Sequence, residues 1–188
     1  MPAGRLNPRW LYPLMAAAAF GAGGALWWVT RDPPAVPVAE GVPEVASAAL
    51  LAAGFVDVAG KPHALGEFQG RIVVVNFWAT WCVPCREEMP AFSRLHERWK
   101  ARGVQFVGLA RDDPAKVARF AAELPVSYPL WIGDEAAGEL SRRFGNRLGV
   151  LPHTVILDRD ARVLDSRVGP YSEAALEAKL RAISPNTR

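Results

Sequence analysis

The sequence predicts an α/β domain in which helices flank a central mixed sheet, and three observations support this class. The β-branched run at residues 72–75 and the mainly apolar run at residues 104–109 are typical of strands that are buried on both faces. Segments with apolar residues at every third or fourth position follow these runs, as amphipathic helices require. A helix between two strands predicts parallel neighbours, whereas the short turn at 158–160 predicts an antiparallel hairpin.

The central element of this prediction is the stretch from Arg71 to Pro90, R-I-V-V-V-N-F-W-A-T-W-C-V-P-C-R-E-E-M-P. A buried strand over residues 72–75 is expected to pass through an aromatic turn, residues 77–81, into two cysteines and a helix. Pro84 suits the first helical turn, because its φ is fixed and it has no N–H to leave unpaired. The apolar residues that follow recur at helical spacing and are Met89, Phe92, Leu95 and Trp99.

Cys82 and Cys85 carry the predicted chemistry, and they are the only cysteines in the sequence. Cys82 should lie at the helix N-terminus, where the partial positive charge stabilises a thiolate and lowers the thiol pKa. Cys85 should lie one turn deeper on the same face, less exposed and close enough to resolve a mixed disulfide. A disulfide between them closes so short a loop that it adds little stability. The pair therefore predicts a redox-active disulfide, with no further cofactor and no metal.

The stretch F-W-A-T-W-C-V-P-C-R-E-E-M-P resembles the active-site signature of the thioredoxin superfamily. More narrowly, it is similar to that of the membrane-anchored TlpA/ResA-like thiol–disulfide oxidoreductases. The later L-P-H-T at residues 151–154 resembles the family's cis-proline loop. The resemblance runs from about Phe55 to the C-terminus. It implies a thioredoxin-like fold with an N-terminal β extension and an inserted βα element at residues 114–130.

The resemblance also implies roles for residues near the cysteines. A glutamate at the place of Glu88 lies beneath the cysteine pair in that family. Partial burial there would raise its pKa and let it exchange protons with the thiols. Asn76 cannot titrate, so Glu88 is the expected proton acceptor. A cis bond at Pro152 would let the neighbouring backbone pair with an extended client chain beside Cys82. The expected client-binding residues are Trp81, Pro84, Leu151 and Pro152.

The other elements are predicted from apolar periodicity and turn residues. The expected strands cover residues 50–58, 63–65, 104–109, 126–130, 155–157 and 162–168. The expected helices cover residues 115–124, 135–144 and 172–183. Gly103 is expected to end the active-site helix, and Ser172 to cap the last one. The thioredoxin-like domain should therefore occupy residues 47–188.

The N-terminal part of the chain predicts a membrane anchor. Residues 11–29 carry no formal charge, and a helix of that length crosses a hydrocarbon core of about 30 Å. Two arginines precede this span and one follows it closely, so residues 1–10 should be cytoplasmic and the domain should lie outside the cytoplasm. A cleaved secretory signal is the alternative, although the run is longer than a usual signal core. Residues 30–46 hold several prolines and should form an extended spacer.

Together these features predict an enzyme of the bacterial inner membrane whose periplasmic domain reduces disulfides in exported proteins through Cys82 and Cys85. The resemblance implies a transmembrane electron donor of the DsbD or CcdA type, and cytochrome c maturation as one pathway served. Two alternatives stay open. They are a disulfide oxidant or isomerase, and a Cu(I) metallochaperone that uses Cys82, Cys85 and His153. The net charge of +3 without a basic, aromatic-rich cluster gives no support to nucleic-acid binding.

Overall fold

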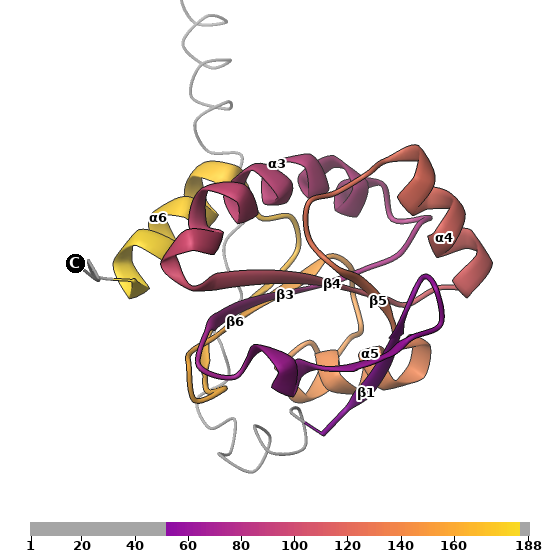
Figure 1. Cartoon of the computed structure of the whole chain (residues 1–188), viewed down its shortest axis with the longest axis horizontal. Coiled ribbons are helices and arrows are strands. Elements are labelled where there is room, and N and C mark those ends of the chain that lie inside the picture. Colours follow the sequence, from indigo (N-terminus) through magenta and orange to yellow (C-terminus); the bar gives the residue numbers. More distant parts are fainter. Residues whose placement is uncertain (1–51, 185–188) are drawn as a thin grey trace, which may run out of the picture. The chain divides into compact units, whose positions relative to one another are not determined.

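A seven-stranded mixed sheet forms the centre of the computed structural model, which describes residues 52–184 (Figure 1). The strands are β1 (Gly54–Asp57), β2 (Pro62–Ala64), β3 (Ile72–Trp78), β4 (Val104–Ala110), β5 (Leu130–Ile132), β6 (His153–Leu157) and β7 (Val163–Val168). Their order across the sheet is β2-β1-β5-β4-β3-β6-β7. The β3–β4 and β4–β5 pairs are parallel, and the other pairs are antiparallel. The predicted mixed sheet is confirmed.

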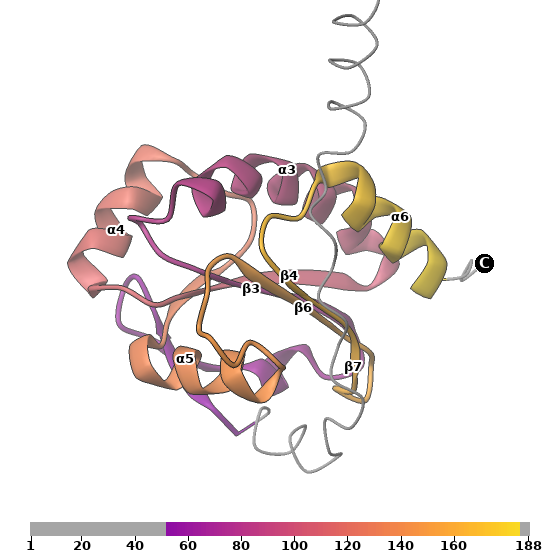
Figure 2. The same ribbon diagram turned by 180° about the vertical axis from the view of Figure 1, so that it is seen from behind.

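Helices cover both faces of this sheet. The α-helices of the described residues are α3 (Val83–Trp99), α4 (Pro114–Glu123), α5 (Asp134–Arg143) and α6 (Glu173–Ile183). Two short 3₁₀ helices are η2 (Leu65–Phe68) and η3 (Lys100–Arg102). α3, α4 and α6 lie on one face, and α5 lies on the other, as both views show (Figure 1, Figure 2).

The two central strands divide the hydrophobic core into two layers. Every residue of β3 and β4 is buried, as their apolar sequences predict. Successive side chains point to opposite faces of a sheet. Trp78 therefore joins the core under α3, α4 and α6, whereas Phe77 joins the core against α5. Cys82 and Cys85 belong to the first of these two cores.

Two predicted boundaries around the central strands are wrong. β3 continues through Phe77 and Trp78, which were expected in a turn, because both residues pair with the end of β4. The strand expected at 126–130 instead covers Leu130–Ile132. Prolines at 125 and 129 have no N–H to donate to a ladder, so pairing with β4 begins only at residue 130.

Most other elements lie where the sequence predicts them. Gly103 follows η3 with a φ of 78°, a left-handed conformation that favours glycine. The Ser172 side chain caps α6 by accepting a hydrogen bond from the Ala175 N–H. β6 begins two residues before the expected strand. The helix of the element expected at residues 114–130 is present as α4, whereas β5 overlaps that range only at Leu130.

The predicted membrane anchor, residues 11–29, and spacer, residues 30–46, lie outside the described residues. Within residues 52–184, no helix combines the length and the apolar character that crossing a bilayer requires.

Candidate active site

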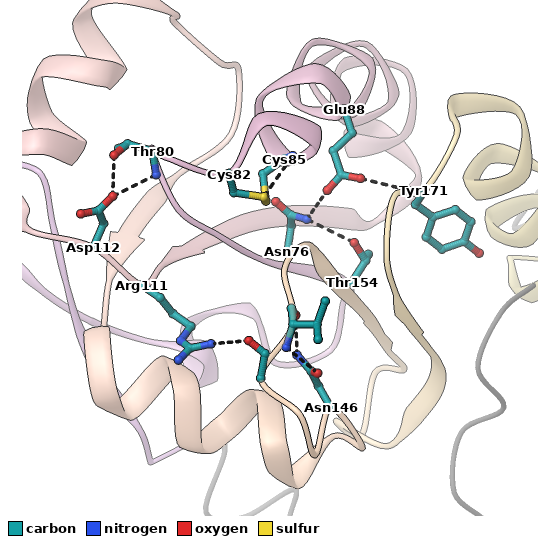
Figure 3. The surroundings of a disulfide bond; sticks show 12 residues. Asn76, Thr80, Cys82, Cys85, Glu88, Arg111, Asp112, Asn146, Thr154 and Tyr171 are labelled. Atoms are coloured by element: carbon teal, nitrogen blue, oxygen red, sulfur yellow. Dashed lines mark hydrogen bonds between the residues drawn. A yellow bond between two sulfur atoms is a disulfide. The ribbon is translucent and has the colours of Figure 1, made fainter. Parts of the chain in front are cut away.

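β3 delivers the chain to two cysteines at the start of α3. Cys82 is the N-cap residue of α3, and its Sγ accepts a hydrogen bond from the Cys85 N–H at 3.3 Å. Pro84 lies half-buried in the first helical turn, as predicted. Cys82 and Cys85 form a disulfide (Figure 3). The Cys82 sulfur therefore lies at the positive end of the helix dipole, where a thiolate is stabilised.

The two sulfurs differ less in exposure than the sequence predicts. Cys82 is 5% exposed and Cys85 is 0% exposed, so the expected order holds but both residues are largely covered. The neighbouring Trp81 and Val83 are 67% and 57% exposed. Trp78, by contrast, is fully buried and packs on other core residues. Of the two tryptophans near the cysteines, Trp81 is thus the one whose ring a partner can reach.

Glu88 lies on α3 one turn after Cys85 and is buried, with 6% of its surface exposed. Its Oε1 accepts a hydrogen bond from Asn76 Nδ2 at 2.8 Å, and its Oε2 accepts one from the Tyr171 N–H at 3.0 Å (Figure 3). Burial raises the pKa of Glu88 to about 7, against the lowering effect of these two donors and of the Arg167 charge. Near neutral pH this carboxyl can therefore both accept and give up a proton.

Asn76 connects three elements beneath the cysteines. Its Nδ2 donates to Glu88 on α3 and also to Thr154 Oγ1 on β6, at 3.2 Å. Its Oδ1 is buried and has no hydrogen-bond partner among the described residues. The sequence indicated that Asn76 cannot titrate, but it did not show that this amide holds the Glu88 carboxylate in place.

A loop between α5 and β6 contributes Leu151 to the core cluster that contains the cysteine pair. The Leu151–Pro152 peptide bond is cis, which confirms the prediction, and Leu151 is half-buried while Pro152 is buried. Asn146 holds this loop through two hydrogen bonds with the Val150 backbone, at 2.7 and 3.1 Å. Arg111, just after β4, donates from Nη1 to the Gly149 carbonyl at 3.0 Å (Figure 3). Neither Asn146 nor Arg111 was among the predicted site residues, and no motif marks them.

The loop that leads into Cys82 is fixed from the other side. Asp112, between β4 and α4, accepts hydrogen bonds from the N–H and the hydroxyl of Thr80. The turn before the cysteines is thereby tied to the segment that starts α4.

The position of His153 contradicts the alternative in which Cys82, Cys85 and His153 bind Cu(I) together. Its side chain is fully buried and stacks on Phe77, at 5.2 Å between ring centres, in the core against α5. Its Nδ1 hydrogen-bonds Ser141 and its Nε2 hydrogen-bonds Ser166, each at 2.9 Å. Burial lowers the pKa of His153 to about 4. The ring thus lies across the sheet from the cysteines with both nitrogens already bonded, so it cannot join a site with them.

Comparison with known proteins identifies the family. The Redoxin family model matches residues 37–180. The chain belongs to the Redoxin family. It is 32% identical over 130 residues to the thiol-disulfide oxidoreductase ResA of Bacillus thuringiensis subsp. konkukian, which covers 69% of this chain and 73% of that protein. The resemblance to ResA-like proteins that the active-site sequence indicates is confirmed. The chain is therefore a thiol–disulfide oxidoreductase.

Solved structures of similar proteins confirm the thioredoxin-like fold. A thioredoxin-related protein from Neisseria meningitidis serogroup B matches with a TM-score of 0.61 at 32% identity, over 68% of this chain and 96% of that one. A thiol:disulfide interchange protein of the thioredoxin family from Chlorobium tepidum TLS matches with a TM-score of 0.59 at 28% identity, over 80% of this chain and 96% of that one.

Proposed function

We propose that this enzyme reduces disulfides in exported proteins outside the cytoplasm, with Cys82 as the attacking thiolate and Cys85 as the resolving thiol. One observation carries the proposal. The Cys82 sulfur caps α3, while the carboxyl of Glu88, with a pKa of about 7, lies buried one turn below Cys85. This arrangement supplies a stabilised nucleophile together with an internal group that exchanges protons at neutral pH.

The reaction begins with the reduced enzyme. The Cys82 thiolate attacks one sulfur of the client disulfide, the client S–S bond breaks, and the second client sulfur leaves as a thiolate that takes up a proton. The Cys85 thiolate then attacks Cys82 Sγ, the mixed disulfide breaks, and the first client sulfur leaves in the same way. The client gains two electrons and two protons, and the enzyme retains the Cys82–Cys85 disulfide.

Glu88 serves the second step in this proposal. Cys85 has no exposed surface, so the proton of its thiol must pass to a group inside the protein before the sulfur can attack. Glu88 is three residues further along the same helix and titrates near neutral pH. We assign it the role of proton acceptor for Cys85 during reduction of the client. It returns the proton when the enzyme is reduced again.

The surface around Cys82 supports docking of an extended client chain. Trp81 and Val83, on either side of Cys82 in the sequence, are exposed, and Leu151, which precedes the cis bond to Pro152, packs on the core cluster that contains both cysteines. We propose that the client backbone pairs beside the cis bond while its apolar side chains contact Trp81. Pro84 completes this surface at the first turn of α3.

The proposed location rests on the sequence of the N-terminal segment, and the proposed electron supply rests on the family resemblance. We propose that residues 11–29 anchor the domain on the periplasmic side of a bacterial inner membrane. Because that compartment is oxidising, a reductant there needs electrons from elsewhere. A transmembrane thiol reductase of the DsbD or CcdA type is the proposed donor. Cytochrome c maturation is the pathway that the family resemblance suggests for the clients.

Trapping of mixed disulfides tests this proposal in cells. Without Cys85 the mixed disulfide cannot be resolved, so a Cys85→Ala variant should accumulate exported proteins linked to Cys82 that a reductant releases. Cys82→Ala is the matched control, and it should capture few proteins because Cys85 is fully covered. Mass spectrometry identifies the captured proteins. Recovery of cytosolic proteins alone, or of none, would contradict the proposal.

A further inference from the structure

A pocket of about 340 Å³ opens between α4 and the segment around the cysteines, to which it is joined by Thr80 before Cys82 and Arg86 after Cys85. Neither the proposed exchange steps nor the cis-proline loop uses it. We call it the cation pocket, and the residues that matter for the argument are Thr80, Arg86, Lys116, Arg119, Phe120 and Glu123. It lies on the α4 side of Cys82, away from β6 and the cis-proline loop.

Contacts with the active-site segment hold this pocket in place. Phe120 of α4 packs on Trp78 at the end of β3, with 4.9 Å between ring centres. The Thr80 N–H donates a hydrogen bond to Asp112, just before α4, and Thr80, in the segment that leads to Cys82, forms one wall of the pocket. Arg86 follows Cys82 by about one helical turn, or roughly 6 Å along the axis. A group bound in the pocket would therefore lie within a few residues of a client cysteine attached to Cys82.

The charges that line the pocket are not balanced within the protein. Three cations face a single carboxylate, Glu123. Neither the Arg86 nor the Arg119 guanidinium has a hydrogen-bond or ion-pair partner within residues 52–184. Lys116 has one distant partner, Asp112, at 3.8 Å, and that carboxylate already accepts hydrogen bonds from Thr80. The two guanidinium groups thus keep all their donors for a ligand.

Arginines elsewhere on α3 behave differently. Arg94 and Arg98 both pair with Glu173 of α6, with N–O distances of 2.6 and 2.5 Å. Their charges are used to join two helices. The contrast indicates that the cations of the pocket are not there to join α3 to α4.

We infer that the cation pocket binds a carboxylate side chain of the client, so that the enzyme prefers clients with an Asp or Glu near the reactive cysteine. A guanidinium binds a carboxylate through two parallel hydrogen bonds, which gives orientation as well as attraction. An extended chain advances about 3.3 Å per residue, so an acid two to four residues from the cysteine spans roughly 7–13 Å. This inference rests on the proposed function and gives its clients a chemical signature.

Exchange with matched peptides tests the inference. Each peptide carries one cysteine, joined as a mixed disulfide to 2-mercaptoethanol. The two peptides of a pair differ only in having an Asp or an Asn at one position, which is placed one to five residues before or after the cysteine. The rate constant for exchange with the reduced enzyme is measured at low ionic strength. We expect the Asp peptide to react about fivefold to tenfold faster than the Asn peptide at one or more spacings. The preference should shrink in 0.5 M salt, because the Debye length falls to about 4 Å.

A double variant and its control decide whether the pocket is responsible. Lys116→Gln with Arg119→Gln removes two of the three cations and should lower the Asp-to-Asn rate ratio towards one, with the remaining preference due to Arg86. Lys100→Gln with Arg102→Gln removes the same charge at the far end of α3 and should keep the ratio of the wild type. Equal rates for both peptides at every spacing in the wild type, or an unchanged ratio in the Lys116/Arg119 variant, would overturn the inference.

The result separates the two proposals. A peptide preference measured by exchange does not depend on the direction in which the enzyme works in the cell. A strongly oxidising midpoint potential would therefore defeat the reductase proposal and leave the acid preference standing. A reducing potential without a preference for the Asp peptide would leave the reductase proposal standing and overturn the inference about the cation pocket.

Discussion

Glu88 offers the sharpest test of how burial prepares this site, and the change to make is Glu88→Gln. Glutamine keeps the shape of the side chain and removes its ionisation. Its Oε1 can still accept the hydrogen bond from the Tyr171 N–H. Asn76 can rotate its amide so that Oδ1, which has no partner among the described residues, accepts from the new Nε2, but Nδ2 then gives up its hydrogen bond to Thr154 Oγ1. The variant should therefore fold with this network rearranged by one hydrogen bond, at a cost that does not change with pH.

The magnitude follows from the pKa of Glu88. Burial raises it from 4.5 to about 7, so between these values the folded protein holds a proton that the unfolded chain has lost. The contribution of Glu88 to the free energy of unfolding then falls as pH rises through this window, by about 3 kcal/mol in total, and is constant outside it. Glu88→Gln removes this term. Relative to the wild type, the variant should gain about 3 kcal/mol between pH 4 and pH 8.

Urea unfolding at a series of pH values measures this difference, and Glu87→Gln is the matched control because Glu87 is exposed on the same helix. The control should follow the wild type at every pH. In exchange assays, loss of the proton acceptor should slow resolution by Cys85 about 100-fold. Parallel pH–stability curves for the wild type and Glu88→Gln would refute the reasoning, as would an unchanged rate of resolution.

Three further predictions concern the fold and the cis-proline loop. Burial lowers the pKa of His153 to about 4, so as pH falls from 6.5 the unfolded chain binds a proton at this position before the folded protein does. In the wild type this lowers the free energy of unfolding by about 3 kcal/mol between pH 6.5 and pH 4. His153→Gln removes that contribution, and urea titrations should show a decrease with falling pH that is smaller by this amount. Gly133→Ala would bring a Cβ within 2.6 Å of the Phe55 ring, and calorimetry should show that the free energy of unfolding falls by about 1–3 kcal/mol. Gly54→Ala is the control, because a Cβ there meets open space, and it should lower the free energy of unfolding by less than about 1 kcal/mol. Arg111→Ala removes the hydrogen bond to the Gly149 carbonyl, so kcat/KM for peptide disulfides should fall about fivefold. Arg111→Lys keeps a donor at this position and should recover part of the loss.

The sequence predicted the parts of the site that depend on local pattern. Pro84 and the apolar spacing after it marked the start of α3 and therefore placed Cys82 at the N-cap. The burial of Glu88 and the cis bond at Pro152 came from the family resemblance, because no spacing rule distinguishes a buried glutamate from an exposed one. Both were confirmed by the structure.

Contacts between distant segments could not be predicted in this way. The Tyr171 N–H that bonds Glu88 lies 83 residues further along the chain, and the Arg111 donor lies 38 residues before the loop that it holds. His153 was expected in a loop, but β6 begins at this residue and pairs it with Phe77. Because strand side chains alternate between faces, that register alone directs the ring away from the cysteines.

The same limit applies to the cation pocket. Arg86, Lys116 and Arg119 are ordinary helix charges in the sequence, and nothing in their spacing shows that α3 and α4 meet. Phe120 of α4 packs on Trp78 at the end of β3, the strand that leads into α3. Cations from the two helices then line one pocket, although they are far apart in the sequence.

The midpoint potential of the Cys82–Cys85 disulfide tests the central claim most directly. The reduced and oxidised forms can be separated after equilibration with defined ratios of reduced and oxidised dithiothreitol or glutathione. A reductase of exported proteins should have a potential near that of thioredoxin, about −270 mV. A potential close to that of DsbA, about −120 mV, would show that the enzyme is an oxidant and would contradict the account.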